Sequence, residues 1–405
     1  MVVTFIYSKN TIEIRQITMQ TPLYIDNQTA LEKLCKELKS APHIALDTEF
    51  LREKTYSARL CLIQIATEQS IACIDPFKLD SLDPFMEILF DRHILKILHS
   101  ARQDLEIFHD LSGKVPGPIF DTQIAATLLG LPDQCGYATL VKQLLNIELD
   151  KTQTRTDWSR RPLDVAQLDY AADDVRYLIQ LYPLMLQQLK TSGREDWLSD
   201  DFLSLETPDI YQLPLDNLWK KVSGHARLKG KQLAIVKQLA IWREKSARAQ
   251  DLPRKWILAD DVIIALARIA PEHPQQMEKI RGLDNSRSKN RGEEILAEIK
   301  TARDMPKEQW PLIATKKTSK EEDVIVDLLM SVLKFLAQKN GISPAILGTR
   351  KDVEKLLTKE SQPALMQGWR KHIAGKMLEE LLEGQQLLKI QNRKLNIEHI
   401  VSEQK

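Results

Sequence analysis

Two acidic residues lie two positions apart in the apolar segment His43–Phe50, which reads HIALDTEF. Residues two apart on a β-strand project from the same face, so the side chains of Asp47 and Glu49 are expected to be neighbours. Such pairs are common on solvent-exposed strands and carry little meaning there. Here the apolar surroundings predict a position near the centre of a sheet, where carboxylates without a counter-charge are costly. The pair therefore predicts a nearby cation.

Three further residues could complete a metal-dependent site. Asp104 stands near the start of an expected helix, where an acid is also favoured simply by the helix N-terminus. Tyr170 and Asp174 are four apart in DYAADDVRYL and share one helix face, although they could equally be a core tyrosine and a surface aspartate. Phosphodiester hydrolysis by two hard cations about 3.5–4 Å apart needs several carboxylates from different segments. In that chemistry the cations activate a water and stabilise the leaving oxygen, and a tyrosine hydroxyl can orient the water.

The chain positions these residues on segments with clear periodicity. Strand patterns with very short separators, which indicate antiparallel hairpins, occupy 43–50, 59–67 and 70–76. A further apolar run at 94–100 leads into an amphipathic helix at 102–110. Helical patterns then occupy 121–130, 137–145 and 164–189. Strands in a meander, followed by strands alternating with helices, predict a mixed α/β sheet with helices packed against it.

Beyond a proline-containing break at 207–215, almost every segment has a helical pattern and no strand is convincing. A faint repeat occurs here at an offset of 89 residues. It pairs Ile257-Leu258 with Ile346-Leu347, Pro274 with Pro363, and Met277 with Met366. Because this small number of matches could arise by chance, an internal duplication is a hypothesis.

The net charge of +1 hides a division between the two halves. Residues 1–210 carry 21 Lys and Arg against 31 Asp and Glu, a net charge of −10, whereas residues 211–405 carry 36 against 25, a net charge of +11. A basic half favours a polyanion and an acidic half could collect cations, although a basic face is often only solvated surface.

Length and composition bound the class of protein. A chain of 405 residues suggests two or three domains. No segment approaches the ~18 apolar residues of a membrane helix and residues 1–10 lack the features of a signal peptide, so we expect a cytoplasmic protein without a membrane partner. The four cysteines lie far apart without a C-x-x-C motif, which predicts buried reduced thiols rather than structural zinc or disulfides.

Several segments, by their order and spacing, resemble the ribonuclease D family over about residues 23–190: DTEF, HSARQDLEIF, FDTQIAATLLG, DKTQTRTDWSRRPL and YAADDVRYL. That family belongs to the DEDDy exonucleases, named for four acids and a tyrosine. The resemblance implies a ribonuclease-H-like α/β exonuclease domain with a mixed sheet flanked by helices. It also implies 3′→5′ hydrolysis of RNA to nucleoside 5′-monophosphates with two divalent ions, Mg²⁺ or Mn²⁺.

By the same resemblance, five residues form the catalytic and metal-binding site: Asp47, Glu49, Asp104, Tyr170 and Asp174. Asp47 would bridge both ions, and Glu49 and Asp174 would hold the ion on the nucleophile side. Asp104 would reach the other ion, and Tyr170 would position the water.

Two other acids are set aside. Asp173 is adjacent to Asp174, but one residue round the helix its side chain faces elsewhere. Asp121 is expected to cap a helix rather than to bind metal.

The family carries C-terminal HRDC domains, small helical modules shared with RecQ-type helicases. The segment WKKVSGHARLKGKQLAIVKQLAIWRE resembles one, and the more divergent segment 320–398 could be a second. We therefore expect an N-terminal extension at 1–21, with Met19 as a second candidate start, an exonuclease domain at 22–206, and two all-α domains: an HRDC domain at 211–292 and an HRDC-like one at 320–400. Candidate phosphate contacts, each of which could also be solvated surface, are Lys220, Lys221, Arg227, Lys229, Lys231 and Lys237.

Two other functions use the same features. A DNA exonuclease could have the same metal site, although paired HRDC-like modules favour RNA. A non-catalytic nucleic-acid-binding protein could keep the fold, although five intact positions argue against it. The family expectation is transfer-RNA precursors with 3′ trailers as substrates. We also expect a monomer, since no obligate protein partner is evident.

Overall fold

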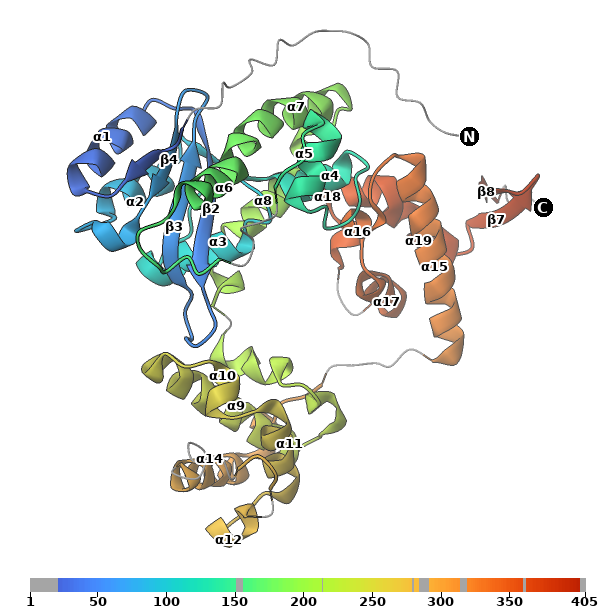
Figure 1. Ribbon diagram of the computed structural model, residues 1–405. Helices are drawn as coiled ribbons and strands as arrows, with labels where there is room; N and C mark the ends of the chain where they lie inside the picture. Colours follow the sequence, from blue (N-terminus) through green and yellow to red (C-terminus); the bar gives the residue numbers. More distant parts are fainter. Residues whose placement is uncertain are drawn as a thin grey trace.

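The structure, a computed structural model, describes residues 21–150, 156–212, 214–278, 280–283, 291–313, 319–359 and 362–400. Figure 1 shows a sheet flanked by helices, followed by two helical units. Of the predicted N-terminal extension, only Thr21 lies within the described residues. None of the described helices is both long enough and apolar enough to cross a membrane.

A six-stranded mixed sheet forms the centre of the N-terminal part. Its strands are β1 (Leu23–Ile25), β2 (His43–Leu51), β3 (Arg59–Ala66), β4 (Ile71–Ile74), β5 (Leu95–Leu98) and β6 (Ile119–Asp121). They lie in the order β1-β4-β3-β2-β5-β6. The β2/β3 and β3/β4 pairs are antiparallel and the other three are parallel. The predicted mixed sheet and its hairpins are confirmed, and the short strands β1 and β6 are additions to it.

Helices cover both faces of this sheet. They are α1 (Gln28–Leu38), α2 (Asp83–Phe90), α3 (Arg102–Ser112), α4 (Thr122–Leu128), α5 (Tyr137–Leu145), α6 (Val165–Arg176), α7 (Leu178–Thr191) and α8 (Ser199–Leu205). On β2, Ile44 and Leu46 belong to a core with residues of α1–α3, whereas Ala45 belongs to a core with residues of α4–α7. Because alternate strand residues share a face, Asp47 and Glu49 follow Ala45 toward the face that α6 covers.

The prediction of a single helix at 164–189 is wrong in one respect, because the structure has two helices there. The helix α6 begins at a capping box in which the side chain of Asp164 accepts from the backbone N–H of Gln167 and the side chain of Gln167 accepts from that of Asp164. It ends at Arg176, with Tyr177 as its C-cap, and α7 begins at Leu178. The apolar periodicity continues through this break, so periodicity alone could not locate it.

The first helical unit follows the break that was predicted at 207–215. It contains α9 (Lys231–Gln250), α10 (Arg254–Ile257), α11 (Asp260–Ile269), α12 (Pro274–Met277) and α14 (Gly292–Asp304), preceded by 3₁₀ turns at Leu215–Lys221 and His225–Arg227. Ile295, Ile299 and Ala302 of α14 are buried in the same core as α9 and α11. The first helical unit therefore extends beyond residue 292, at which its end was predicted from the sequence.

The second helical unit is not entirely helical. It contains α15 (Lys320–Lys339), α16 (Pro344–Leu347), α17 (Arg350–Thr358), α18 (Gly368–Arg370) and α19 (Lys376–Leu382). An antiparallel hairpin of β7 (Gln386–Gln391) and β8 (Lys394–His399) then follows. The expectation of an all-α domain over 320–400 is therefore wrong for this last part. Asn392 and Arg393 both have positive φ angles, the conformation that a tight hairpin turn requires.

The two helical units share an order of elements. The helices α9 and α15 are both 20 residues long and begin 89 residues apart, at Lys231 and Lys320. Each is followed by a four-residue helix and then by a longer one. This order supports the duplication hypothesis, and the identity of the second unit as HRDC-like stays a prediction.

The second unit packs against the N-terminal part of the chain. The rings of Trp197 and Trp369 are stacked with centroids 4.6 Å apart. Arg370 donates to Asp201 at 2.7 Å, and the backbone N–H of Ser343 donates to the carbonyl of Thr127 at 2.8 Å. Residues of both parts share one buried cluster, so this unit is continuous with the core of the N-terminal part.

The first unit touches the N-terminal part through the loop between β2 and β3. The Tyr56 ring packs on the core of that unit, and its hydroxyl hydrogen-bonds with Glu244. Arg248 and Arg254 each donate to the same hydroxyl at 2.9 Å. The backbone N–H of Tyr56 donates to Asp251 at 3.0 Å. This contact fixes the unit beside the hairpin whose first strand carries Asp47.

Candidate active site

The strand β2 positions the first two acids. Asp47 lies opposite Gln64 on β3, and Glu49 lies opposite Leu62. The register shifts directly after Glu49, at the step to Phe50. Such irregularities increase local twist and re-aim side chains, and they occur often beside active sites. The predicted pairing of Asp47 and Glu49 on one face is confirmed by this register.

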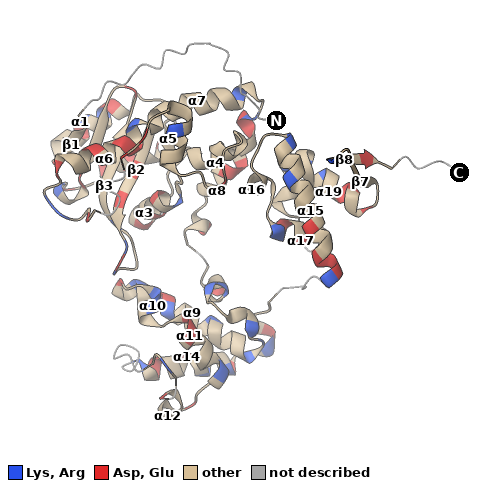
Figure 2. Cartoon of the chain, turned by 45° about the vertical axis from the view of Figure 1, so that its right-hand side comes forward, with Lys and Arg blue, Asp and Glu red and all other residues tan. Residues whose placement is uncertain are grey.

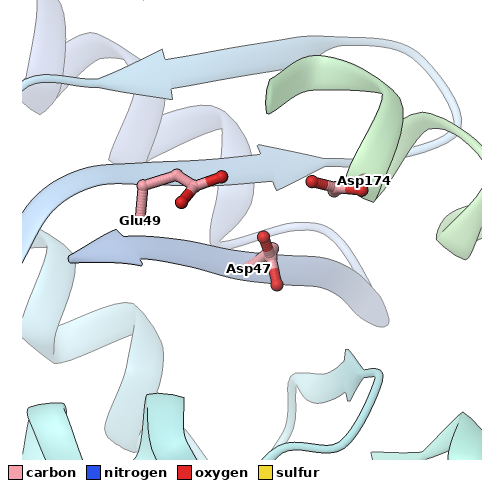
Figure 3. Close-up of side chains that lie close together, drawn as sticks. All are labelled: Asp47, Glu49 and Asp174. Atoms are coloured by element: carbon pink, nitrogen blue, oxygen red, sulfur yellow. The ribbon is translucent and has the colours of Figure 1, made fainter. Parts of the chain in front are cut away.

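The helix α6 brings the third acid. Carboxylate oxygens of Asp47, Glu49 and Asp174 all lie within 4.8 Å of one another. Figure 3 shows the side chains of β2 and α6 converging on one point. Tyr170 lies one turn earlier on α6, on the same helix face as Asp174, with its ring centroid 6.3 Å from that of Trp158. Asp173 instead forms an ion pair with Arg176.

Asp104 approaches the cluster from α3. It is buried in the first turn of that helix and accepts a hydrogen bond from the Thr48 hydroxyl at 2.5 Å. Thr48 stands between the two acids of β2, so this bond ties α3 to the strand at the site. Asp104 is not among the three acids that gather within 4.8 Å, but its charge acts on Asp47 more strongly than any other neighbouring charge.

Asp121 performs the structural task that was predicted for it. Its carboxylate accepts from the backbone N–H groups of Gln123 and Ile124 at the start of α4. It also accepts from Ser100 at 3.1 Å and from Ala101 at 2.8 Å, just before α3. One carboxylate therefore holds the starts of both helices, including the helix that carries Asp104.

Burial raises the pKa values of all four acids, and the charges of other members of the set contribute for Asp47 and Glu49. Burial, followed by the charges of Asp104, Asp174 and Glu49, raises the pKa of Asp47 well above its ordinary value. Burial and the charges of Asp174 and Asp104 raise the pKa of Glu49 to about 8. Burial is also the main cause that raises the pKa values of Asp104 and Asp174 to about 7. A site that opposes ionisation of its own carboxylates in this way is suited to a cation.

Three neighbours of the acids were not singled out from the sequence. Thr48 holds Asp104, as described above. Tyr137 donates from its hydroxyl to the backbone carbonyl of Asp173 at 2.8 Å, and burial with the charges of Asp174 and Asp47 raises its pKa well above the ordinary value. Gln64 lies directly across from Asp47. The sequence does not show that a single Thr, Tyr or Gln lies beside the acids. Alternation on the paired strands β2 and β3 could have suggested that Gln64 shares a sheet face with Asp47.

The predicted phosphate contacts lie in the first helical unit, on the 3₁₀ turns and the start of α9. The exposed members of the set are Lys220, Lys221, Arg227, Lys229 and Lys231. Lys237 differs, because it is half-buried and forms an ion pair with Asp216 at 2.7 Å. Figure 2 shows Lys and Arg distributed over the unit that contains α9, α11 and α14.

Comparisons with known proteins identify the class to which this fold and site belong. A family model for the 3′-5′ exonuclease domain matches residues 22–190, and a model for the HRDC domain matches residues 232–299. The N-terminal part is therefore a 3′-5′ exonuclease domain, and an HRDC domain follows it.

The relatives narrow this class to one family. Ribonuclease D of Sphingobium indicum is 36% identical over 383 residues, which cover 93% of this chain and 98% of that protein. Ribonuclease D of Zymomonas mobilis is 38% identical over 382 residues, which cover 92% of this chain and 97% of that protein. The crystal structure of Escherichia coli RNase D, described as an exoribonuclease involved in structured RNA processing, matches with a TM-score of 0.82 at 30% identity, covering 90% of this chain and 99% of that one. The chain belongs to the ribonuclease D family of 3′→5′ exoribonucleases, as its motifs predicted.

Proposed function

We propose that this exoribonuclease trims structured RNAs, transfer-RNA precursors with 3′ trailers among them, from a free 3′ hydroxyl to nucleoside 5′-monophosphates. Two divalent cations, Mg²⁺ or Mn²⁺, would be bound by Asp47, Glu49, Asp104 and Asp174. One observation carries the proposal: carboxylates from β2 and α6 converge within 4.8 Å, and the strongest neighbouring charges that act on Asp47 and Glu49 are those of other carboxylates.

The donor set fits hard divalent cations, which prefer carboxylate oxygens. The acids come from three separate elements, β2, α3 and α6, so the fold itself brings their charges together. When bound, two such cations supply an activated water and charge stabilisation of the leaving oxygen. A cation would also offset the cost of burying these carboxylates in ionised form, which is the main cause of their raised pKa values.

The protein's own groups would divide the remaining tasks. Asp47 feels the charge of all three other acids, which supports a shared position between two cations. The Thr48 hydroxyl holds the Asp104 carboxylate in one orientation. Tyr170, one helical turn before Asp174, would hydrogen-bond the attacking water and align it with the scissile phosphate.

The helical units would supply much of the attraction for RNA. The N-terminal half is acidic and must accept a phosphate backbone, whereas residues 211–405 carry a net charge of +11. The β2–β3 loop fixes the first unit beside the exonuclease domain through Tyr56, so its exposed lysines could hold the body of a structured RNA. The proposal includes a cytoplasmic location, which the four free, buried cysteines support, and a monomeric state.

One gel assay tests this function. Full-length protein is incubated with a 3′-tailed transfer RNA and with a DNA of matched sequence, with Mg²⁺ or with EDTA. The expected result is a ladder shortening from the 3′ end of the RNA, release of 5′-monophosphates, slower cleavage of the DNA and no cleavage in EDTA. Faster cleavage of the DNA would favour a DNA exonuclease, and binding without cleavage would favour the non-catalytic alternative.

A further inference from the structure

Gln64 is a buried polar residue at the centre of the sheet. Its side chain is 0% exposed, on the central strand β3. Among the described residues, neither its amide nitrogen nor its amide oxygen has a hydrogen-bond partner. Burial of an amide without a partner costs free energy, so such a group in a native protein calls for an explanation.

The surroundings of Gln64 leave few polar partners within reach. Its neighbours on the same face of β3 are the buried apolar residues Leu62 and Ala66. Across β4 lies Cys73, whose thiol contacts the Leu168 carbonyl of α6 at 3.9 Å. Across β2 lies Asp47, the central acid of the cluster.

The geometry of the β2/β3 pair makes Asp47 the accessible partner. Directly opposed residues of an antiparallel pair have Cβ atoms about 4.5–5.5 Å apart, so rotation of a glutamine side chain is enough to bridge them. An ionised carboxylate, which only accepts hydrogen bonds, therefore stands opposite an amide whose donor has no partner among the described residues.

We propose that Gln64 is a positioning residue: its amide nitrogen donates a hydrogen bond to the Asp47 carboxylate when that carboxylate holds a divalent cation. The inference rests on the proposed metal-dependent function and deepens it. The hydrogen bond would fix the orientation of a carboxylate that holds the cation. Groups that orient metal ligands in this way are commonly needed for full metal affinity.

The test compares Mn²⁺ binding with stability in the absence of metal, using the full-length chain without RNA. Gln64→Met keeps the approximate volume and removes the amide. Calorimetry is expected to show Mn²⁺ binding weakened about 10–100-fold. In EDTA the melting temperature is expected to stay equal or to rise, because an unpaired buried amide has been removed.

Gln123→Met is the matched control. Gln123 lies in the same domain and donates to the Cys135 carbonyl at 3.2 Å, so this variant loses a hydrogen bond that exists. It is expected to melt lower in EDTA and to bind Mn²⁺ with wild-type affinity. A positioning residue should thus affect Mn²⁺ affinity without lowering the melting temperature, whereas a structural residue should lower the melting temperature without affecting Mn²⁺ affinity.

Two outcomes decide the matter. Equal Mn²⁺ affinities of Gln64→Met and the wild type would overturn the positioning role and leave the proposed function intact, whereas a wild-type chain that binds no Mn²⁺ would contradict the proposed function itself. If Gln64→Met does not fold, Gln64→Asn shortens the same amide by one methylene. Weaker Mn²⁺ binding by that variant supports the role of Gln64, and wild-type affinity overturns it.

Discussion

Replacing Asp174 with asparagine should stabilise the metal-free protein at alkaline pH. A carboxyl group whose pKa rises from 4.5 to about 8 on folding, as that of Glu49 does, destabilises the folded state by on the order of 5 kcal/mol once it is ionised. Burial is the larger cause and the charge of Asp174 the next. Because the charge of Asp174 also acts on Asp47, removing it is expected to raise the free energy of unfolding by on the order of 1–2 kcal/mol.

The sign of this effect depends on pH. The folded state holds protons on these acids more tightly than the unfolded state, so the stability of the metal-free protein falls as pH rises through about 7 and 8, the pKa values of Asp174 and Glu49. At pH 8.5 in EDTA, Asp174→Asn should therefore melt about 2–8 °C above the wild type. Well below pH 7 Asp174 is itself largely neutral, so the difference should shrink.

Differential scanning fluorimetry in EDTA and in Mg²⁺ measures both effects. In Mg²⁺ the wild type should melt above Asp174→Asn, because the bound cation stabilises the protein that retains all its carboxylates. Asp133→Asn, at an exposed turn before α5, is the matched control and should show neither effect. If Asp174→Asn melts below the wild type at pH 8.5 in EDTA, repulsion among the carboxylates does not control this site and the reasoning is wrong.

Four further outcomes are expected. EDTA should abolish RNA hydrolysis and Mg²⁺ or Mn²⁺ restore it, and Asp47→Asn should be inactive with a native circular-dichroism spectrum; full activity in EDTA would contradict the metal mechanism. Tyr170→Phe should lose ~10²–10⁴ in rate while keeping Mn²⁺ affinity, whereas Asp174→Ala should lose that affinity; calorimetry showing no Mn²⁺ binding by Tyr170→Phe would overturn this division. A 3′-phosphate on the RNA should block digestion, and internal cuts in circular RNA would be incompatible with an end-recognising pocket. Lys221→Ala should make the slope of the logarithm of the RNA association constant against log salt shallower by ~0.7–0.9, whereas Lys237→Ala, whose lysine pairs with Asp216, should change it less; an unchanged slope for Lys221→Ala would show that Lys221 is only solvated surface.

The sequence was sufficient for the class of fold and for the family. Alternation in HIALDTEF placed Asp47 and Glu49 on one face, and the i, i+4 spacing placed Tyr170 on the helix face of Asp174. These are local consequences of strand and helix geometry, which depend on spacing alone. The order and spacing of the motifs identified the family for the same reason.

The C-terminal half was harder to predict. The hairpin at 386–399 was overlooked because its turn, Asn392-Arg393, lacks the glycine that usually marks such a turn. The length of the first helical unit depends on the burial of Ile295 and Ile299 against α9, a contact between distant segments. The ion pair of Lys237 with Asp216 likewise sets this lysine apart from the other candidate phosphate contacts, a difference that composition could not show.

Only the tertiary structure decided how the acids meet. The sequence indicated that Asp47, Asp104 and Asp174 belong together but could not show that Thr48 bonds to Asp104, or that Tyr137 supports α6 behind Asp174. Nor could it show that the amide of Gln64 lies unpaired opposite Asp47. Spacing along the chain fixes which residues share a strand or helix face, whereas contacts between elements depend on strand register and on how helices pack across the sheet. Those are properties of the whole fold.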